Sequence, residues 1–147
     1  VYSYTGARLA AGVIDFREVG PLMEPRVIRL EELGGKFEDG MLRAFVVGGT
    51  GRLGNIYLSI DRHLFNEIQP EFGEMFDITI RRKEDLIWQE NTPYAKSFGD
   101  VSVGDNLLFV NSSGYLSLAI NQGNFANKYS IESGKDWSIE ISRHAPR

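Results

Sequence analysis

The feature that most constrains the fold is a series of short runs in which apolar and polar residues alternate. Seven such runs, separated by turns, occur at Leu42–Val47, Ile56–Ile60, Phe76–Ile80, Leu86–Gln89, Leu107–Asn111, Tyr115–Ile120 and Trp137–Ile141. A period of two places every second side chain on one face, as in a strand with one buried side. Short strands at close spacing favour an antiparallel sheet over alternating strands and helices. The sequence therefore predicts a mainly β domain, either an antiparallel barrel or a sandwich.

Two short helices are expected outside these runs. Residues 4–12 are rich in small helix formers and end at a glycine suited to a helix C-terminus, and a second helix is expected within Asp61–Ile68. The prolines and glycine of residues 20–25 break the chain between the first helix and the strands. Asn111–Gly114 is expected to form a hairpin turn. The chain begins at Val1, inside a helical pattern, so we expect a fragment or a processed product.

Composition excludes several classes of function. The net charge of −4 offers no basic stripe for nucleic acid, so we expect no nucleic-acid partner. The chain has no cysteine, and its two histidines lie far apart, so we expect no disulfide and no metal site. No apolar run approaches the ~20 residues that span a bilayer. We therefore expect a soluble, cytoplasmic protein without a membrane partner.

The stretch VVGGTGRLGN, residues 46–55, contains the G-x-G-x-x-G spacing of dinucleotide-binding turns. Such a turn needs a helix directly after its last glycine, so that the helix N-terminus can hold the phosphates. The residues after Gly54 instead alternate with a period of two and are rich in β formers. The sequence favours a glycine-rich loop between antiparallel strands, in which Asn55 and backbone groups could approach a ligand closely.

The triplet Asp61-Arg62-His63 resembles an acid and base set, but adjacent residues point in different directions and do not converge on one reacting atom. We expect Asp61 to cap the short helix and His63 to face solvent. Trp88 and Trp137 lie in strand runs, where burial is expected for an indole.

Phe98 lies in a polar loop, Lys96–Asp100, where local propensity gives no reason for an aromatic side chain. Two interpretations stay open for it. The ring could stack on a base or nucleoside, since aromatic side chains in loops commonly serve that purpose. Alternatively, it could fold back onto the core.

The run NSSGYLSLAINQGNF, residues 111–125, together with Leu53-Gly54-Asn55 and Phe98-Gly99-Asp100, resembles the C-terminal domain of the S-adenosyl-L-methionine (SAM) hydroxide adenosyltransferases. That family also contains the SAM-dependent fluorinase and chlorinase. The resemblance covers residues 38–147. Residues 4–21 resemble the last helix and exit of the family's N-terminal domain. The resemblance implies three segments. Residues 1–25 are the last helix and exit of an N-terminal α/β domain, residues 26–37 are a linker, and residues 38–147 form a seven-stranded antiparallel β-barrel domain.

The resemblance also implies a function. Family members cleave SAM by displacement at the ribose C5′, where water or a halide attacks and methionine leaves, with no metal or other cofactor. The site lies in a homotrimer, between this domain and the N-terminal domain of a neighbouring subunit. We expect the protein that contains this chain to be a hydrolase, which makes adenosine and methionine from SAM, rather than a halogenase. The activating Asp, Arg and His of the hydrolases belong to the N-terminal domain, so this chain alone is expected to be inactive and to hold no catalytic residue.

Position by position, the resemblance assigns contacts to the two ends of SAM. Asn55 matches the residue that hydrogen-bonds adenine, and Phe98 matches the aromatic ring that stacks on it. Ser112 and Ser113 fall in the turn that receives the methionine carboxylate, where a nest of backbone N–H groups suits an anion. The backbone that meets the adenine edge runs through Ile120, Asn121 and Gln122.

Two positions depart from the family pattern. Thr50 stands where relatives carry an Asp that holds the methionine ammonium, and Leu53 stands where they carry a Phe that packs on the base. Loss of the carboxylate would remove about 2–3 kcal/mol of charge-assisted binding. Alternative functions are therefore a non-catalytic adenosine-binding or trimerisation module and a divergent member acting on another adenosyl substrate. Binding of NAD rests on the glycine spacing alone.

Overall fold

The computed structural model describes residues 2–28, 32–49, 51 and 53–145. The prediction made for Thr50 therefore lies outside the described residues. The chain divides into two compact units, residues 1–31 and residues 32–147.

The first unit holds a short helix, as predicted. Helix α1 spans Tyr2–Ala10, and Gly12 follows it with a φ of 66°. A 3-10 turn, η1 (Phe16–Glu18), is held by a reciprocal cap in which Arg17 N donates to Asp15 and Asp15 N donates to Glu18. No described side chain of this unit is buried. The unit therefore has no hydrophobic core within its described residues.

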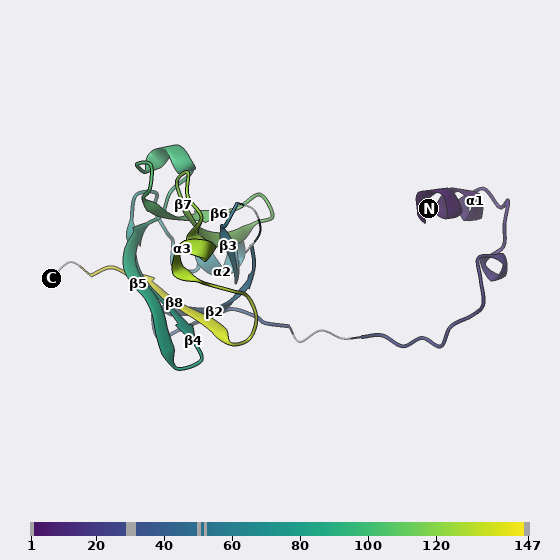
Figure 1. Cartoon of the computed structure of the whole chain (residues 1–147), viewed down its shortest axis with the longest axis horizontal. Helices are drawn as coiled ribbons and strands as arrows, with labels where there is room; N and C mark the ends of the chain where they lie inside the picture. Colours follow the sequence, from purple (N-terminus) through teal and green to yellow (C-terminus); the bar gives the residue numbers. More distant parts are fainter. Residues whose placement is uncertain (1, 29–31, 50, 52, 146–147) are drawn as a thin grey trace. The chain divides into compact units, whose positions relative to one another are not determined.

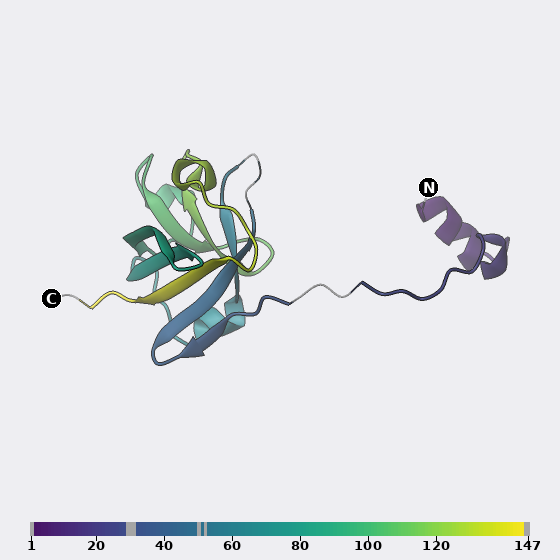
Figure 2. The ribbon, with the colours of Figure 1, turned by 60° about the horizontal axis from the view of Figure 1, so that its bottom comes forward.

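The second unit is a curled antiparallel sheet, which confirms the predicted mainly β, barrel-like fold (Figures 1 and 2). Its strands follow the order β5-β4-β8-β2-β3-β7-β6, and β1 pairs with β2. The two edge strands meet at an isolated bridge between Tyr94 and Leu108, where Ala95 N donates to Leu108 O at 2.8 Å. The strands are β1 (Lys36–Glu38), β2 (Met41–Gly48), β3 (Ile56–Asp61), β4 (Met75–Arg82), β5 (Asp85–Pro93), β6 (Asn106–Val110), β7 (Tyr115–Ile120) and β8 (Trp137–Arg143).

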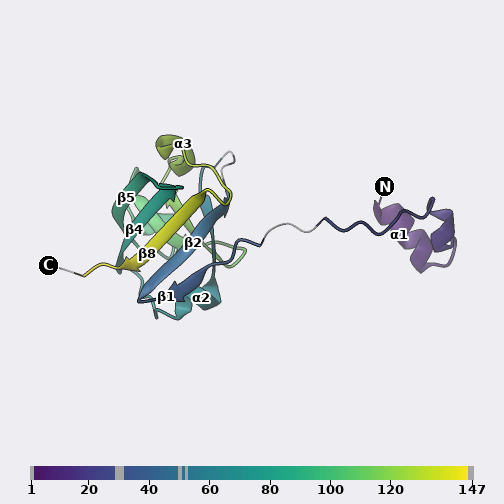
Figure 3. The same ribbon diagram turned by 90° about the horizontal axis from the view of Figure 1, so that it is seen from below.

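Each of the seven predicted runs coincides with a strand, although Asn111 lies just beyond the end of β6, and the structure adds β1 as an eighth strand. This strand, Lys36–Glu38, lies beside β2 at the edge seen in Figure 3, where a linker of residues 26–37 was predicted to end. Asp39 and Gly40, between paired Glu38 and Met41, both have positive φ, 53° and 75°. That is the conformation of a two-residue hairpin loop, for which Asp-Gly is a favoured sequence. The Asp39-Gly40 turn thus joins β1 to β2 in a hairpin, whereas the apolar pattern placed the first strand at Leu42.

The core lies inside the curled sheet, built from the apolar set of each alternating run. On β3 it takes Ile56, Leu58 and Ile60, each fully buried, and Trp88 and Trp137 join the same cluster as expected. Burying one side chain of this size contributes about 1.5–3 kcal/mol, so these alternating positions supply most of the driving force for closure. The other residues of each strand point outward, and these outward faces carry the candidate site.

Two short helices complete the second unit. Helix α2 (Arg62–Asn66) begins as predicted, because Asp61 Oδ1 accepts a hydrogen bond from Leu64 N at 2.8 Å, and His63 is exposed. Helix α3 (Phe125–Tyr129) was not predicted; Asn124 caps it by accepting from Asn127 N at 2.7 Å. None of the helices described is long and apolar enough to cross a membrane.

Candidate functional site

The candidate site is the outward face of strands β3, β7 and β6. Tyr57 on β3 pairs with Ser117 on β7, which pairs with Phe109 on β6, so these three side chains form one row across the sheet. Asn55 precedes Tyr57 by two residues and shares its face by the strand period. We call this surface the β3–β7–β6 outer face.

Phe98 joins this face from the connection between β5 and β6. It lies in the 3-10 turn η2 (Phe98–Asp100), and its ring centroid is 5.2 Å from that of Phe109. The side chain nevertheless keeps 37% of its surface exposed, and that of Tyr57 keeps 42%. Phe98 therefore packs against Phe109 while part of its side chain stays exposed, and stacking of a base on it stays a prediction.

The connection that carries Phe98 is held down by Asn121. Asn121 Nδ2 donates to Val101 O at 2.9 Å, its backbone N donates to Asp105 O at 2.9 Å, and its carbonyl accepts from Gly104 N at 2.8 Å. Ala95, Leu107 and Ala119 form a small second core beneath the connection. The backbone of Asn121, predicted to meet the adenine edge, is thus engaged within the chain.

The neighbours of Asn121 differ in environment. Ile120 is buried in the main core, and its carbonyl accepts from Gly123 N at 3.0 Å, so a ligand could reach Ile120 only through its backbone. Gln122 is exposed and has a φ of 57°, which places it at the tip of the turn after β7. Of the three residues predicted at this edge, Gln122 is the most accessible to a ligand.

The predicted carboxylate turn is organised by Asn111. Asn111 Oδ1 accepts from Ser113 N at 2.9 Å and from Tyr115 N at 3.1 Å, and its carbonyl accepts from Gly114 N at 3.0 Å. Three of the backbone N–H groups expected to form an anion-binding nest are therefore already used. An anion here would instead meet the exposed hydroxyls of Ser112 and Ser113.

Asn111 also connects the turn to the outer face, because its Nδ2 donates to the hydroxyl of fully buried Ser117 at 2.9 Å. Sequence reasoning missed this residue and Tyr57 as parts of the site. The sequence contained a signal for each of these residues. For Asn111, an Asn at the start of an N-S-S-G turn commonly accepts a hydrogen bond from the backbone two residues further along the chain. Tyr57 shares the face of Asn55 by the strand period.

The glycine-rich loop forms the opposite border of the face. Strand β3 follows Gly54 almost directly and is antiparallel to β2, so the helix of a dinucleotide-binding turn is replaced by a strand. Gly54 has a φ of 69° and lies directly against the side chain of Asn124, and its carbonyl accepts from Ala126 N at 2.9 Å. Leu53 is 74% exposed, so its side chain is available to a partner rather than packed.

Asn55 and the Ser112–Ser113 turn, predicted to contact adenine and the methionine carboxylate, lie at opposite ends of the β3–β7–β6 outer face. Asn55 precedes β3, whereas Asp61 at the end of β3 pairs with Tyr115, and Arg62 N donates to Gly114 O at 2.8 Å. At the rise of a strand, residues 55 and 61 are separated by about 20 Å. Along strand β3, the outer face therefore extends over about 20 Å between these two ends.

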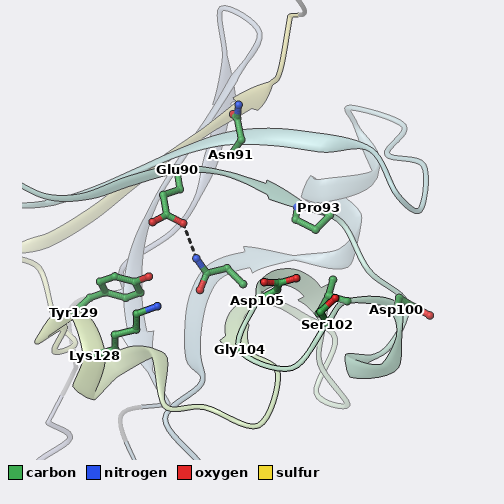
Figure 4. A pocket seen from close by; sticks show the side chains of 11 residues that line it. Glu90, Asn91, Pro93, Asp100, Ser102, Gly104, Asp105, Lys128 and Tyr129 are labelled. Atoms are coloured by element: carbon green, nitrogen blue, oxygen red, sulfur yellow. Dashed lines mark hydrogen bonds between the residues drawn. The ribbon is translucent and has the colours of Figure 1, made fainter.

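A separate hollow of about 540 Å³ lies where β5 and β6 part, between β5, the connection that follows it, and α3 (Figure 4). Asn106 Nδ2 donates to the Glu90 carboxylate at 2.7 Å across this gap. Lys128 lies at 4.9 Å from the ring of Tyr129, and a hydrogen bond with Tyr129 raises the pKa of the Lys128 ammonium. Part of the connection between β5 and β6 lines this polar hollow, but none of the residues that line it is among the predicted nucleoside contacts.

Comparison with known proteins shows the family of this chain. Residues 52–138, more than half of the chain, match the SAM hydroxide adenosyltransferase C-terminal domain. The chain belongs to this family. A curated relative is the fluorinase from Actinopolyspora mzabensis. It is 31% identical to this chain over 106 residues, which cover 71% of the chain.

Solved structures resemble the chain as well. An uncharacterized conserved protein from Thermotoga maritima superposes with a TM-score of 0.71 at 26% identity, covering 93% of this chain. A conserved hypothetical protein from Thermus thermophilus gives a TM-score of 0.58 at 19% identity over 92% of the chain, which shows a shared fold. The chain spans 33% of the fluorinase and 48% of each of these structures. It therefore covers less than half of the length of each of these proteins.

Proposed function

We propose that the β3–β7–β6 outer face binds the adenosine portion of SAM, and that the protein containing it hydrolyses SAM to adenosine and L-methionine. The observation that carries the proposal is the row Tyr57–Ser117–Phe109, which brings Asn55 and Phe98 to one surface. A nucleoside is recognised by an amide that reads the base edge and by a flat apolar ring on which the base stacks. Asn55 supplies the amide and Phe98 supplies the ring.

The proposed reaction is a displacement at the ribose C5′. Water attacks this carbon, the C5′–S bond breaks, the sulfur takes the bonding pair and leaves as the neutral thioether of methionine, and the attacking water loses a proton. Because the sulfonium is a good leaving group, the protein has mainly to position the water and the substrate and to exclude bulk solvent. We therefore propose that the reaction uses no metal and no other cofactor.

The catalytic groups are proposed to come from outside this chain. Asp61 caps α2 and His63 is exposed, so the local Asp61-Arg62-His63 triplet supplies no convergent acid and base set. We propose that the N-terminal domain of a neighbouring subunit in a cytoplasmic homotrimer closes the outer face and supplies the groups that activate water. The 147-residue chain alone then binds substrate and does not turn it over.

One observation favours a second candidate, a module that binds adenosine or another adenosyl compound without cleaving SAM. The N–H groups of Ser113, Gly114 and Tyr115 are bonded to Asn111, so the amino-acid end of SAM has fewer donors than the resemblance implies. The departures at Thr50 and Leu53 favour the same candidate.

Calorimetric titration of the chain with adenosine, SAM and NAD separates these candidates. We expect adenosine and SAM to bind and NAD to bind more weakly than either. Adenosine binding without SAM binding would favour the non-cleaving module, and tight NAD binding with no response to adenosine would contradict both. For the longer protein, the products formed from SAM in buffers with and without fluoride and chloride decide the reaction. Adenosine in every buffer supports hydrolysis, and 5′-halogenated deoxyadenosine contradicts it.

A further inference from the structure

The connection between β5 and β6, which carries Phe98, is attached to the rest of the domain at few points. Across residues 96–105 only Val101 is partly buried, and the other residues are exposed. Among the hydrogen bonds of the described residues, those that join this segment to another part of the chain all involve Asn121. The other hydrogen bonds of the segment lie within it. The place of the connection on the outer face therefore depends strongly on Val101 and Asn121.

Val101 is held through both its side chain and its carbonyl. The side chain packs on the small second core of Ala95, Leu107 and Ala119. The carbonyl accepts from Asn121 Nδ2 at 2.9 Å. An apolar contact is not directional and allows the connection to slide over the sheet, whereas a hydrogen bond weakens steeply when its geometry changes. The amide of Asn121 is thus the contact that fixes where Val101 lies along the face.

The turn η2 transmits this placement to Phe98. Val101 N donates to Phe98 O at 3.4 Å, and Asp100 N donates to Ser97 O at 3.2 Å. The Asp100 carboxylate accepts from Ser97 N at 2.7 Å and closes the turn. Because these bonds make the turn a compact unit, a displacement of Val101 would also displace the Phe98 ring from its contact with Phe109.

The side chain of residue 121 has a separate task from its backbone. The backbone N–H and carbonyl of Asn121 bond to Asp105 and Gly104, and any residue could make these two bonds. Only a side chain with a suitably placed donor can reach the carbonyl of Val101. The requirement for an amide at this position therefore comes from the placement of Val101 alone.

We propose that the Asn121 side chain is a positioning residue for the base: it holds the Phe98 ring where adenine stacks, by fixing the connection through Val101. The inference rests on the proposed function, in which Phe98 supplies the stacking ring. The Asn121 amide acts through Phe98 and needs no contact of its own with the ligand. It takes no part in the attack on C5′.

The test is a double-mutant cycle of Asn121→Asp and Phe98→Ala, with adenosine affinity measured by calorimetric titration. Aspartate has the shape of asparagine but lacks the N–H donor, so only the bond to the Val101 carbonyl is lost. The ring then occupies its held position for part of the time, and adenosine should bind roughly threefold to tenfold more weakly. With alanine at position 98 there is no ring to position, so the same substitution should change the affinity by less than about twofold.

Hydrogen exchange of the unliganded chain gives a second readout that does not depend on any ligand. In Asn121→Asp the amides of Val101 and Gly104 should exchange faster than in the wild type, because the connection opens more often. Asn121→Ala removes the amide without adding a charge. It replaces Asn121→Asp if that variant has a lowered thermal midpoint, and it should show the same dependence on Phe98.

Asn106→Asp is the matched control, since it removes an amide donor from the residue directly after the connection. Asn106 Nδ2 donates to Glu90 at 2.7 Å, and by the strand period Asn106 faces away from Phe109 and the outer face. This variant should leave the adenosine affinity unchanged in both backgrounds, whatever its effect on stability.

Each other outcome overturns the inference. An equal loss of affinity with and without the Phe98 ring would show that Asn121 acts on the ligand by another route, while adenosine binding by the outer face still stands. Unchanged affinity, or unchanged exchange at Val101 and Gly104, would show that the amide does not hold the connection. If the wild-type chain does not bind adenosine, the proposed function fails together with the inference.

Discussion

At the scale of single residues, Phe98 combines a packing contact with exposed ring surface. Its ring packs on Phe109, which anchors the connection between β5 and β6 to the outer face. More than a third of the side chain stays exposed, next to the row that holds Tyr57. A ring already ordered by the protein loses little conformational freedom when a base stacks on it, which favours binding.

We expect Phe98→Ala to weaken adenosine binding by about 1–3 kcal/mol, the range for loss of one base-stacking contact. Calorimetric titration measures this change. Phe72→Ala is the matched control, because Phe72 is also exposed and stacks on an aromatic ring, Tyr94, at 4.8 Å. It should lower stability to a similar degree without changing adenosine affinity. An unchanged affinity in Phe98→Ala would assign the ring to packing alone.

At the scale of elements, the glycine-rich loop and α3 support each other. Gly54 lies directly against the side chain of Asn124, and Asn124 in turn caps α3 through Asn127 N. The bond from Ala126 N to Gly54 O joins the two segments a second time. Since Asn55 is the next residue along the chain, this packing also fixes where the predicted adenine contact enters β3.

Gly54→Ala should therefore destabilise the protein by about 1–3 kcal/mol. The new methyl group would collide with the cap of α3, and alanine disfavours the φ of 69° found at this position. Urea denaturation followed by circular dichroism measures the loss. Gly51→Ala serves as the control, because a methyl group there meets open space, and it should change stability by less than about 0.5 kcal/mol. Equal effects of the two substitutions would argue against this packing.

At the scale of the whole molecule, the stability of the chain resides in the second unit. Every residue of the buried core lies at position 42 or later, whereas the described part of residues 1–31 contains no buried side chain. The chain spans 33% of the fluorinase and 48% of the Thermotoga maritima structure, and its second unit contains one nearly closed, barrel-like sheet. The barrel should therefore be an independent folding unit.

We expect a chain of residues 32–147 to unfold in one cooperative transition, with a thermal midpoint within a few degrees of that of the 147-residue chain. The physical reason is that the described part of residues 1–31 contributes no side chain to the buried core. Thermal scans of both chains by circular dichroism provide the comparison. A broad, non-cooperative transition in the shorter chain would show that the first unit contributes to folding.

The sequence by itself determined the features that depend on local pattern. The two-residue period located all seven predicted strands, Asp61 was identified as a cap, and Asn111–Gly114 as a turn, because each depends on residues close together in the chain. Helix α3 and strand β1 were not predicted, because each is at most five residues long and carries little periodic signal. The predicted ligand contacts came from the family resemblance and stay predictions.

Only the tertiary structure decided which strands are neighbours. Alternation tells which face a side chain occupies, but not which strand lies beside it, because strand order is set by long-range pairing and closure of the core. The order β3-β7-β6 aligned Tyr57 with Ser117 and Phe109 and so brought Phe98 to the face of Asn55. The same pairing placed Asp61 beside the Ser112–Ser113 turn, more than 50 residues away in sequence.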